Sequence, residues 1–517
     1  DRTDRTGGDG GTEKGIDRGD TLIDEQGLRD IHAAGYMTAI EAGVQSVMAS
    51  FNSWNGVRLH GHKYLLTDVL KNQMGFDGFV VSDWGSISEM IAHGYVADNK
   101  QAAKFALNAG SDMDMESYAY VNHLVALVNE GKVTLSDVDD AVKRILRVKF
   151  ELGLFDNPYK YCDEANEKAT VGKKEFNEVV LDVAKKSIVL LKNDKNLLPL
   201  AKSGLKIGLI GALANDKTSP LGSWRIGADD ETAVSVLEGL QQYKDNQLTY
   251  KKGVDVTIGE TKFVTELKIN TTDRSSFSEA ITLAKQSDVV VMVLGEHGLQ
   301  SGEGRSRTDL GLPGLQQELL EAVHQVNPNI VLVLNNGRPL VLTWATQNIP
   351  AIVEAWHLGT QSGNAIAQVL YGDYNPSGKL PMTFPRSVGQ IPIYYNYKNT
   401  GRPSMNEPGS VFWSHYTDEL NTPLYPFGYG LSYSKFEYSN LKLSNASFSK
   451  GGNITVTVTV KNTGKFTGKE VVQLYIRDLV GSLTRPVKEL KGFELIELKP
   501  GAQKEVVFVI NEKTIEY

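Results

Sequence analysis

Apolar residues follow two alternating patterns over the first 150 residues, and these patterns predict strands separated by helices. Apolar side chains recur three or four positions apart, as on one face of a helix, at 24–42, 63–73, 102–109 and 136–150. Consecutive apolar residues predict short buried strands at 44–51 and 79–82. At the start of the last helix, Ser136 and Asp139 have the spacing of a variant capping box. The order strand, helix, strand predicts parallel βα units.

A second region, 206–385, has longer apolar runs with helical patterns between them. The predicted strands are 207–210, 289–294, 330–335 and 351–355, and the helices between them include 278–285 and 315–326. Near-continuous apolar strands between helices are typical of a doubly wound parallel sheet. The charged residues 155–205, which precede this α/β sandwich domain, are predicted to form a linker.

The last part of the chain changes to a period of two. Residues 386–439 are rich in Pro, Tyr and Asn and are predicted to be a second linker. From residue 440 onward apolar side chains alternate with threonine, as at Ile454, Val456 and Val458. This alternation predicts a β-sandwich of fibronectin type III appearance over 440–517.

Composition and charge exclude several classes of protein. The net charge is −8 and no long basic run is present, which argues against nucleic acid as a partner and favours a neutral substrate. No run of about 18 apolar residues occurs, so we expect no membrane span. The single Cys162 excludes an intrachain disulfide and a multi-cysteine metal site. The nine histidines lack metal-ligand spacing and Gly208–Gly211 does not match a nucleotide motif, so we expect neither metal nor cofactor.

The stretch Phe79–Ile87, FVVSDWGSI, carries the first candidate for chemistry. Asp83 follows a predicted buried strand directly, at the place where barrel enzymes keep their catalytic groups. The residues alone also allow Asp83 to be the cap of the next helix. The longer run GFDGFVVSDWGSI resembles the nucleophile strand of glycoside hydrolase family 3. That resemblance implies that Asp83 attacks the anomeric carbon of a sugar.

Further motifs occur in the order of the same family. They are GDGGT, SDW, LLKN, the GE loop, NNGRPL, GDYNPSGKLPMTFPRSVGQIP and YPFGYGLSY. The resemblance implies a (β/α) barrel of the TIM type, and 111–115 resembles its last strand. Only about three of the eight barrel strands can be counted, so 1–154 is expected to be the C-terminal part of a barrel. We expect a missing N-terminal segment, and truncation of the β-sandwich at its end.

The region 1–20 carries a departure from the family pattern. GDGGTEKGID resembles a loop of the exo-glucanase branch, in which a Lys-His pair before the loop binds sugar hydroxyls. Thr6 and Gly7 stand at those positions here. The resemblance therefore implies that these sugar-binding residues are absent, and we expect the chain alone to be inactive or nearly so.

A second carboxyl group is needed, because glycosidic bonds break through an oxocarbenium-like transition state between two carboxyl groups. The loop 295–309 follows an apolar strand and resembles the acid/base loop of bacterial periplasmic β-glucosidases of the family. Glu303 falls on the acid/base position, and Glu296, nearer the strand, is expected to have a structural role. Arg305 or Arg307 is expected to hold Asp309. The residues alone fit a solvated charged loop equally well.

Four further side chains are candidates for sugar binding. Indole rings stack on the C–H faces of sugars, and Trp84 and Trp224 are the candidates for such a clamp. Met48 and Phe51 fall on family positions that line the sugar pocket, although many relatives have Tyr where Phe51 stands. For all four residues, packing in the core is the alternative.

The resemblance implies a retaining, exo-acting β-glucosidase that removes terminal non-reducing β-D-glucosyl residues from a small neutral oligosaccharide or glucoside. In a retaining enzyme the carboxyl groups of Asp83 and Glu303 should lie about 5–5.5 Å apart. A β-xylosidase of the same family and a non-catalytic carbohydrate-binding or assembly fragment are the alternatives. We expect a periplasmic or secreted protein, and whether it forms a homodimer is left open.

Overall fold

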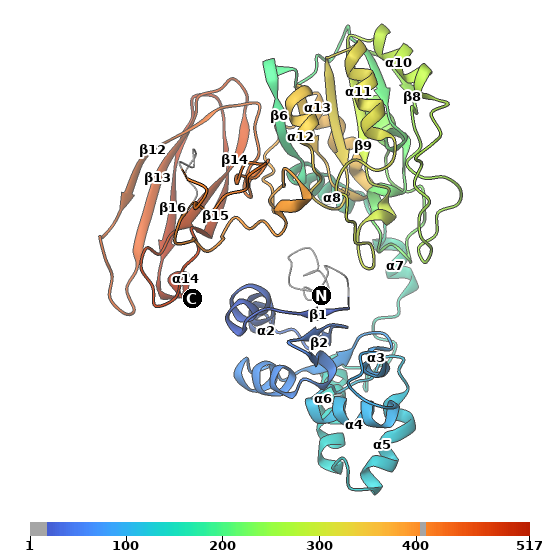
Figure 1. Ribbon diagram of the computed structural model, residues 1–517, viewed down its shortest axis with the longest axis vertical. Coiled ribbons are helices and arrows are strands. Elements are labelled where there is room, and N and C mark those ends of the chain that lie inside the picture. Colours follow the sequence, from blue (N-terminus) through green and yellow to red (C-terminus); the bar gives the residue numbers. More distant parts are fainter. Residues whose placement is uncertain (1–17, 404–409, 517) are drawn as a thin grey trace. The chain divides into compact units, whose positions relative to one another are not determined.

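The computed structural model describes residues 18–403 and 410–516. The predicted loop at 8–17, with Thr6 and Gly7, lies outside the described residues. The chain divides into two compact units, Asp1–Val171 and Gly172–Tyr517, which are described here one after the other (Figure 1).

The first unit contains the predicted parallel βα arrangement. Strand β2 (Ser46–Ala49) pairs in parallel with β5 (Phe79–Ser82), and Val81 forms a parallel bridge to Met113. The remaining elements of the unit are β1 (Asp20–Thr21), α1 (Glu25–Gly27), η3 (Leu28–Ala33), α2 (Ala34–Glu41), β3 (Ser53–Trp54), β4 (Val57–Arg58), η4 (Leu59–Gly61), η5 (Tyr64–Gln73), α3 (Ser86–Ala92), α4 (Asn99–Ala109), α5 (Ala119–Asn129), α6 (Leu135–Glu151) and α7 (Glu164–Thr170).

The two faces of the β2–β5 pair differ in burial. Val80 is fully buried, in a cluster with Leu66 and Leu70 of η5. The other face carries Met48 and Met113, which are 40% and 43% exposed. Successive side chains of a strand point to opposite faces, so this alternation follows directly from the register Met48–Val81 and the bridge Val81–Met113.

The capping box of α6 lies two residues earlier than predicted. Thr134, with extended backbone, is the cap: its Oγ1 accepts from the backbone N–H of Asp137, and the Asp137 carboxylate accepts from the Thr134 N–H. The prediction of Ser136 and Asp139 was wrong because Thr-x-x-Asp has the same spacing as Ser-x-x-Asp. Ser136 is therefore inside the first helical turn.

A six-stranded sheet forms the centre of the second unit, with the order β6-β11-β10-β9-β7-β8. Five strands are parallel, as predicted, whereas the edge strand β6 runs antiparallel to β11. The strands are β6 (Val189–Asn193), β7 (Lys206–Ile210), β8 (Gln247–Lys251), β9 (Val289–Gly295), β10 (Ile330–Asn335) and β11 (Ala351–Glu354). The interval 155–205 is thus not only a linker, because β6 belongs to the sheet.

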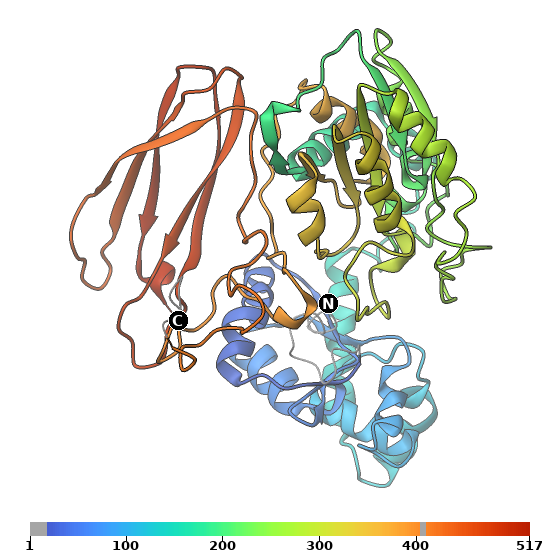
Figure 2. The same ribbon diagram turned by 45° about the horizontal axis from the view of Figure 1, so that its top comes forward.

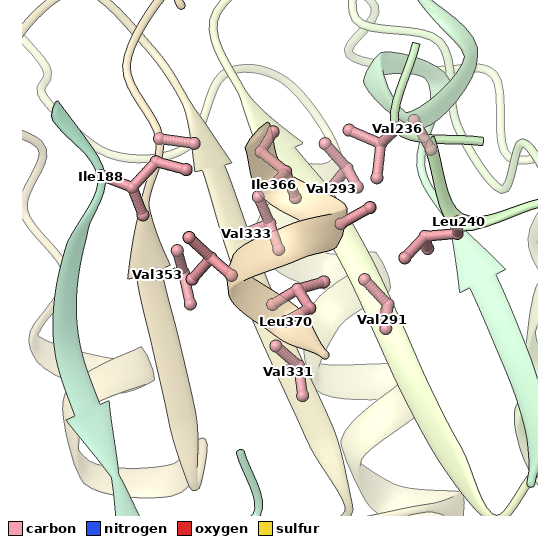
Figure 3. Packing of buried hydrophobic residues seen from close by; sticks show 14 of the residues in the cluster. Ile188, Val236, Leu240, Val291, Val293, Val331, Val333, Val353, Ile366 and Leu370 are labelled. Carbon is pink, nitrogen blue, oxygen red and sulfur yellow. The ribbon is translucent and has the colours of Figure 1, made fainter. Parts of the chain in front are cut away.

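Helices cover both faces of this sheet. One face packs against α8 (Lys174–Ser187), α9 (Val236–Leu240) and α13 (Ser362–Leu370). The other packs against α10 (Phe277–Gln286), α11 (Gln316–Val326) and α12 (Thr343–Asn348). Figure 3 shows Ile366 and Leu370 of α13 over valines of β9, β10 and β11. Short helical turns occur at η6 (Asp194–Asn196), η7 (Ala212–Asn215), η8 (Ser219–Leu221), η9 (Gly298–Gln300), η10 (Gly359–Gln361) and η11 (Val388–Gln390).

The C-terminal strands form two antiparallel sheets, β12-β13-β16 and β14-β15, in agreement with the predicted β-sandwich (Figure 2). The elements are β12 (Phe436–Leu443), β13 (Ile454–Asn462), β14 (Gly468–Ile476), β15 (Glu489–Leu498), β16 (Gln503–Ile510) and α14 (Glu512–Ile515).

The C-terminal part of the predicted linker 386–439 contacts the α/β domain and is more ordered than expected. Tyr425 is buried in the core of the α/β domain, and Leu431 forms an antiparallel bridge to Leu190.

Candidate active site

Asp83 lies at the C-terminal end of β5, where the sequence predicted it, and its side chain is half-buried. Met115, two residues after the Val81–Met113 bridge, holds the turn that follows Asp83. The backbone N–H of Met115 donates to Ser82 Oγ, and the N–H of Gly85 donates to Met115 O, both at 2.8 Å. Gly85, at φ +69°, is the residue that caps α3. Asp83 is therefore not the N-cap residue of α3, and its Oδ1 accepts from the Trp84 N–H at 2.6 Å.

Two buried polar pairs support this turn, and the sequence analysis missed both. Lys71 Nζ lies 2.7 Å from Asp112 Oδ1, and the other carboxylate oxygen of Asp112 accepts from the Val80 N–H at 2.8 Å. His60 is fully buried and its Nε2 lies 2.7 Å from Ser86 Oγ. Asp112 belongs to the motif Ser111–Met115, which resembles the last barrel strand and could have indicated it; in the structure this motif forms only the Met113 bridge.

The three predicted sugar-binding side chains of the first unit differ in exposure. Trp84 is 65% exposed and Met48 is 40% exposed, so both present apolar surface outside the core. Phe51 is only 4% exposed, and the guanidinium of Arg18 lies 4.2 Å from its ring centroid. Phe51 is thus covered, with a guanidinium against its ring, whereas Met48 and Trp84 are open.

In the second unit, the candidate residues lie on two loops at the point where the strand order reverses. From β7 the chain passes to β8 on one side and then to β9 on the other. Ligands of open α/β sheets bind at such a point, outside the carboxyl ends of the strands. The loop after β7 carries Trp224, and the loop after β9 carries Glu303. The two loops touch, because the N–H of Gly298 donates to Ser219 Oγ at 3.0 Å.

Glu296, the first residue of the loop after β9, is fully buried. Its Oε1 lies 2.7 Å from Arg307 Nη1 and 3.0 Å from Arg338 Nε, and its Oε2 accepts from the Gly337 N–H at 3.2 Å. Burial of a carboxylate is costly unless it is paired and hydrogen-bonded, as it is here. This environment agrees with the structural role expected for Glu296.

Glu303 lies farther out on the same loop, between Gly302 at φ +118° and Gly304 at φ +68°, and is half-buried. The Arg305 guanidinium donates to the backbone oxygens of Glu303 at 2.7 Å, Leu299 at 2.6 Å and Phe263 at 2.6 Å. The prediction that Arg305 or Arg307 holds Asp309 was wrong. Both arginines hold other parts of the loop, and Asp309 Oδ1 instead accepts from the Gly311 N–H.

Trp224 is 60% exposed and leans with its ring edge-on against Phe263, with centroids 5.2 Å apart. The guanidinium of Arg305 lies 5.1 Å from the centroid of the Phe263 ring. An indole, a phenyl ring and a guanidinium thus lie in series, and the guanidinium contacts the backbone of Glu303. Sequence reasoning found Trp224 but missed Phe263, which lies in a stretch without strand or helix pattern.

Glycosidases break sugar linkages with a pair of Asp or Glu side chains. Family profiles match both units: that of the glycosyl hydrolase family 3 N-terminal domain over residues 6–148, and that of its C-terminal domain over residues 188–433. The chain belongs to glycoside hydrolase family 3. A fibronectin type III-like profile matches residues 470–517 of the family 3 chain.

Similarity to individual glycosidases supports the family assignment. The chain is 42% identical to a periplasmic β-glucosidase of Salmonella typhimurium, over 98% of this chain and 68% of that protein. It is 40% identical to a β-xylosidase of Formosa agariphila, over 96% of this chain and 68% of that protein. A solved β-glucosidase of Listeria innocua in complex with isofagomine superposes with a TM-score of 0.90 at 36% identity, over 97% of this chain and 68% of the other.

Two structural features are absent from the residues that the structure describes. Over 18–403 and 410–516, no group of three or more His, Cys, Asp or Glu side chains is arranged to hold a metal ion. Within the same ranges, no helix combines the length and the apolar character needed to cross a membrane.

Proposed function

We propose that this family 3 hydrolase is a retaining, exo-acting β-glucosidase that removes terminal non-reducing β-D-glucosyl residues from oligosaccharides or glucosides. The single observation that carries the proposal is the 42% identity to a periplasmic β-glucosidase over nearly the whole chain. Localisation in the periplasm, or secretion, is part of the same proposal.

In the proposed reaction, Asp83 is the nucleophile and Glu303 is the acid and base. The Asp83 carboxylate attacks the anomeric carbon, while the bond to the leaving oxygen breaks and Glu303 transfers its proton to that oxygen. Glu303, now a carboxylate, then takes a proton from water. This water attacks the anomeric carbon and releases Asp83, so two inversions give overall retention.

Three features of the chain support these assignments. Asp83 follows a parallel strand with one buried face, at the strand end where catalytic groups of barrel enzymes lie. Glu303 is on a loop at the sheet's switch point, where such sheets bind ligands. Glu296, the competing carboxylate, is occupied by two guanidinium groups and is fully buried.

A second candidate is a β-xylosidase, which the 40% identity to a Formosa agariphila β-xylosidase favours. A xylosyl unit lacks the hydroxymethyl group of glucose, so the two activities differ in what the pocket must accommodate. The likeness to a solved β-glucosidase of Listeria innocua over 97% of this chain adds support for the glucosidase, and a direct assay separates the two activities.

The test compares nitrophenyl β-glucoside with nitrophenyl β-xyloside. Because the chain spans 68% of the Salmonella relative, both the 517-residue chain and the same chain joined to the unmatched part of that relative are assayed. We expect a higher kcat/KM for the glucoside and a β-anomeric first product by NMR. A higher kcat/KM for the xyloside would favour the second candidate. Carbohydrate binding without turnover in either form would favour a binding module, and an α-anomeric product would contradict the mechanism.

A further inference from the structure

Arg338 holds two separate parts of the loop that carries Glu303. It lies just after β10, and its Nη2 donates to the backbone oxygen of Gln300 and, at 2.9 Å, to that of Arg305. These two carbonyl groups bracket Glu303, three residues before it and two residues after it. One guanidinium therefore ties the incoming and the outgoing limb of the loop together.

The same guanidinium is anchored to the sheet by Glu296. Arg338 Nε lies 3.0 Å from Glu296 Oε1, and the neighbouring Gly337 N–H donates to Glu296 Oε2 at 3.2 Å. Arg307 Nη1 contacts the same oxygen, Glu296 Oε1, at 2.7 Å, and Arg307 also donates to the backbone oxygen of Gly311. The buried Glu296 is thus the fixed point to which both arginines attach the loop.

The backbone around Glu303 is conformationally permissive, so contacts from outside the loop are needed to fix it. Gly302 and Gly304, at φ +118° and +68°, flank it on both sides, and glycine restricts its own backbone less than any other residue. A general acid must lie within hydrogen-bond reach of the leaving oxygen, and small displacements of such a group reduce the rate strongly.

We propose that Arg338 is a positioning residue for leaving-group protonation: it fixes the loop so that the carboxyl group of Glu303 is held in one place. This inference rests on the proposed role of Glu303. Lysine would keep the positive charge near Glu296, but a single ammonium cannot reproduce the planar fork that reaches a carboxylate and two carbonyl groups together. Arg338→Lys is therefore expected to lose the positioning and to keep the charge.

The first test measures the loop directly, by hydrogen–deuterium exchange in the full chain. In Arg338→Lys and Arg338→Gln, amides of 298–309 should exchange at least about tenfold faster, while strands β9 and β10 remain protected. The control is Arg274→Lys, whose arginine makes a bidentate pair, 2.7 Å at both ends, with the exposed Glu318 of α11. Unchanged exchange in the loop, or equal loss of protection in the strands, would overturn the proposal.

The second test separates positioning from general damage, by using leaving groups of different quality in the catalytically active form. Dinitrophenyl β-glucoside needs little protonation, so Arg338→Lys should keep kcat/KM within about twofold, whereas a methyl β-glucoside should lose about tenfold or more. Equal losses on both substrates with an active wild type would overturn the role of Arg338 alone. A wild type that hydrolyses no glycoside would overturn the proposed function, and with it this role.

Discussion

Lys71 and Asp112 form a buried ion pair next to β5, the strand that precedes Asp83, with Nζ and Oδ1 2.7 Å apart. Their side chains are 7% and 3% exposed. Burial raises the pKa of the Asp112 carboxyl and lowers the pKa of the Lys71 ammonium, while the Coulombic attraction within the pair opposes both shifts. Because Asp112 also accepts from the Val80 N–H, the pair connects η5 to β5.

We predict that breaking this pair from one side is strongly destabilising. Asp112→Ala leaves a buried ammonium without its carboxylate, and a loss of about 3–5 kcal/mol in the free energy of unfolding is expected. The combined Lys71→Met and Asp112→Ala variant should lose less than the sum of the two single variants, because neither charge is then left alone. Urea denaturation of the four proteins measures this coupling.

The control is the exposed pair Lys100–Glu130, at 2.6 Å with 38% and 46% side-chain exposure. Removal of either partner should cost less than about 1 kcal/mol, since surface ion pairs contribute little. A loss for Asp112→Ala that is no larger than that of Glu130→Ala would contradict the prediction.

The two glutamates of the loop after β9 should respond differently to replacement. In Glu303→Ala, hydrolysis of glucosides with poor leaving groups should fall by about 10²–10⁴, while good leaving groups are spared and azide partly restores activity. Glu296→Ala instead leaves the Arg307 and Arg338 guanidiniums without their shared carboxylate, so we expect lower thermal stability and no azide rescue. Glucosyl azide formation is followed by NMR. Rescue of Glu296→Ala but not of Glu303→Ala would reverse the assignment.

Local sequence pattern predicts some features of this fold and not others. The parallel sheet was predictable because its continuous apolar runs report burial on both faces, as in β9 and β10. The strand at 79–82 was predictable from its apolar and β-branched residues, although its two faces differ in burial. Strand β8 was missed, since its position at the sheet edge allows the polar sequence QLTYK. The partners of Arg307 and Arg338 were not predictable either, because their shared carboxylate meets them only through the packing of loops from different strands.

His60 should make the first unit sensitive to acid. Burial lowers the pKa of His60 to about 3, from an ordinary value of 6.5. The unfolded chain therefore binds a proton between these two values and the folded chain does not. This contribution to stability is fully present above pH 6.5 and is lost as the pH falls toward about 3, by up to about 1.4 kcal/mol per pH unit.

The variant His60→Gln cannot titrate, so it isolates this contribution. Between pH 6.5 and about 5, the stability difference between wild type and variant should shift by about 2 kcal/mol in favour of the variant. Urea denaturation at a series of pH values gives this difference. A difference that does not depend on pH would show that His60 titrates alike in the folded and the unfolded chain.

The last prediction concerns the exposed ring of Trp224 and its neighbour Phe263, on the assumption that the proposed function holds. Their edge-to-face contact, at 5.2 Å and 67°, keeps the indole 60% exposed beside the loop of Glu303. If this indole contacts the leaving sugar or aryl group, Trp224→Ala should lower kcat/KM about tenfold on cellobiose and on aryl glucosides, a loss of about 1.4 kcal/mol. β-Glucosyl fluoride has no such group, so its kcat/KM should change less than about twofold. Phe263→Ala should have a smaller effect of the same kind, because it removes the support of the indole and not its contact with the leaving group.

The matched control is Val264→Ala, at an 86% exposed position next to Phe263, which should behave as wild type. An equal loss on glucosyl fluoride would show that Trp224 supports the fold of the loop and does not bind the leaving group.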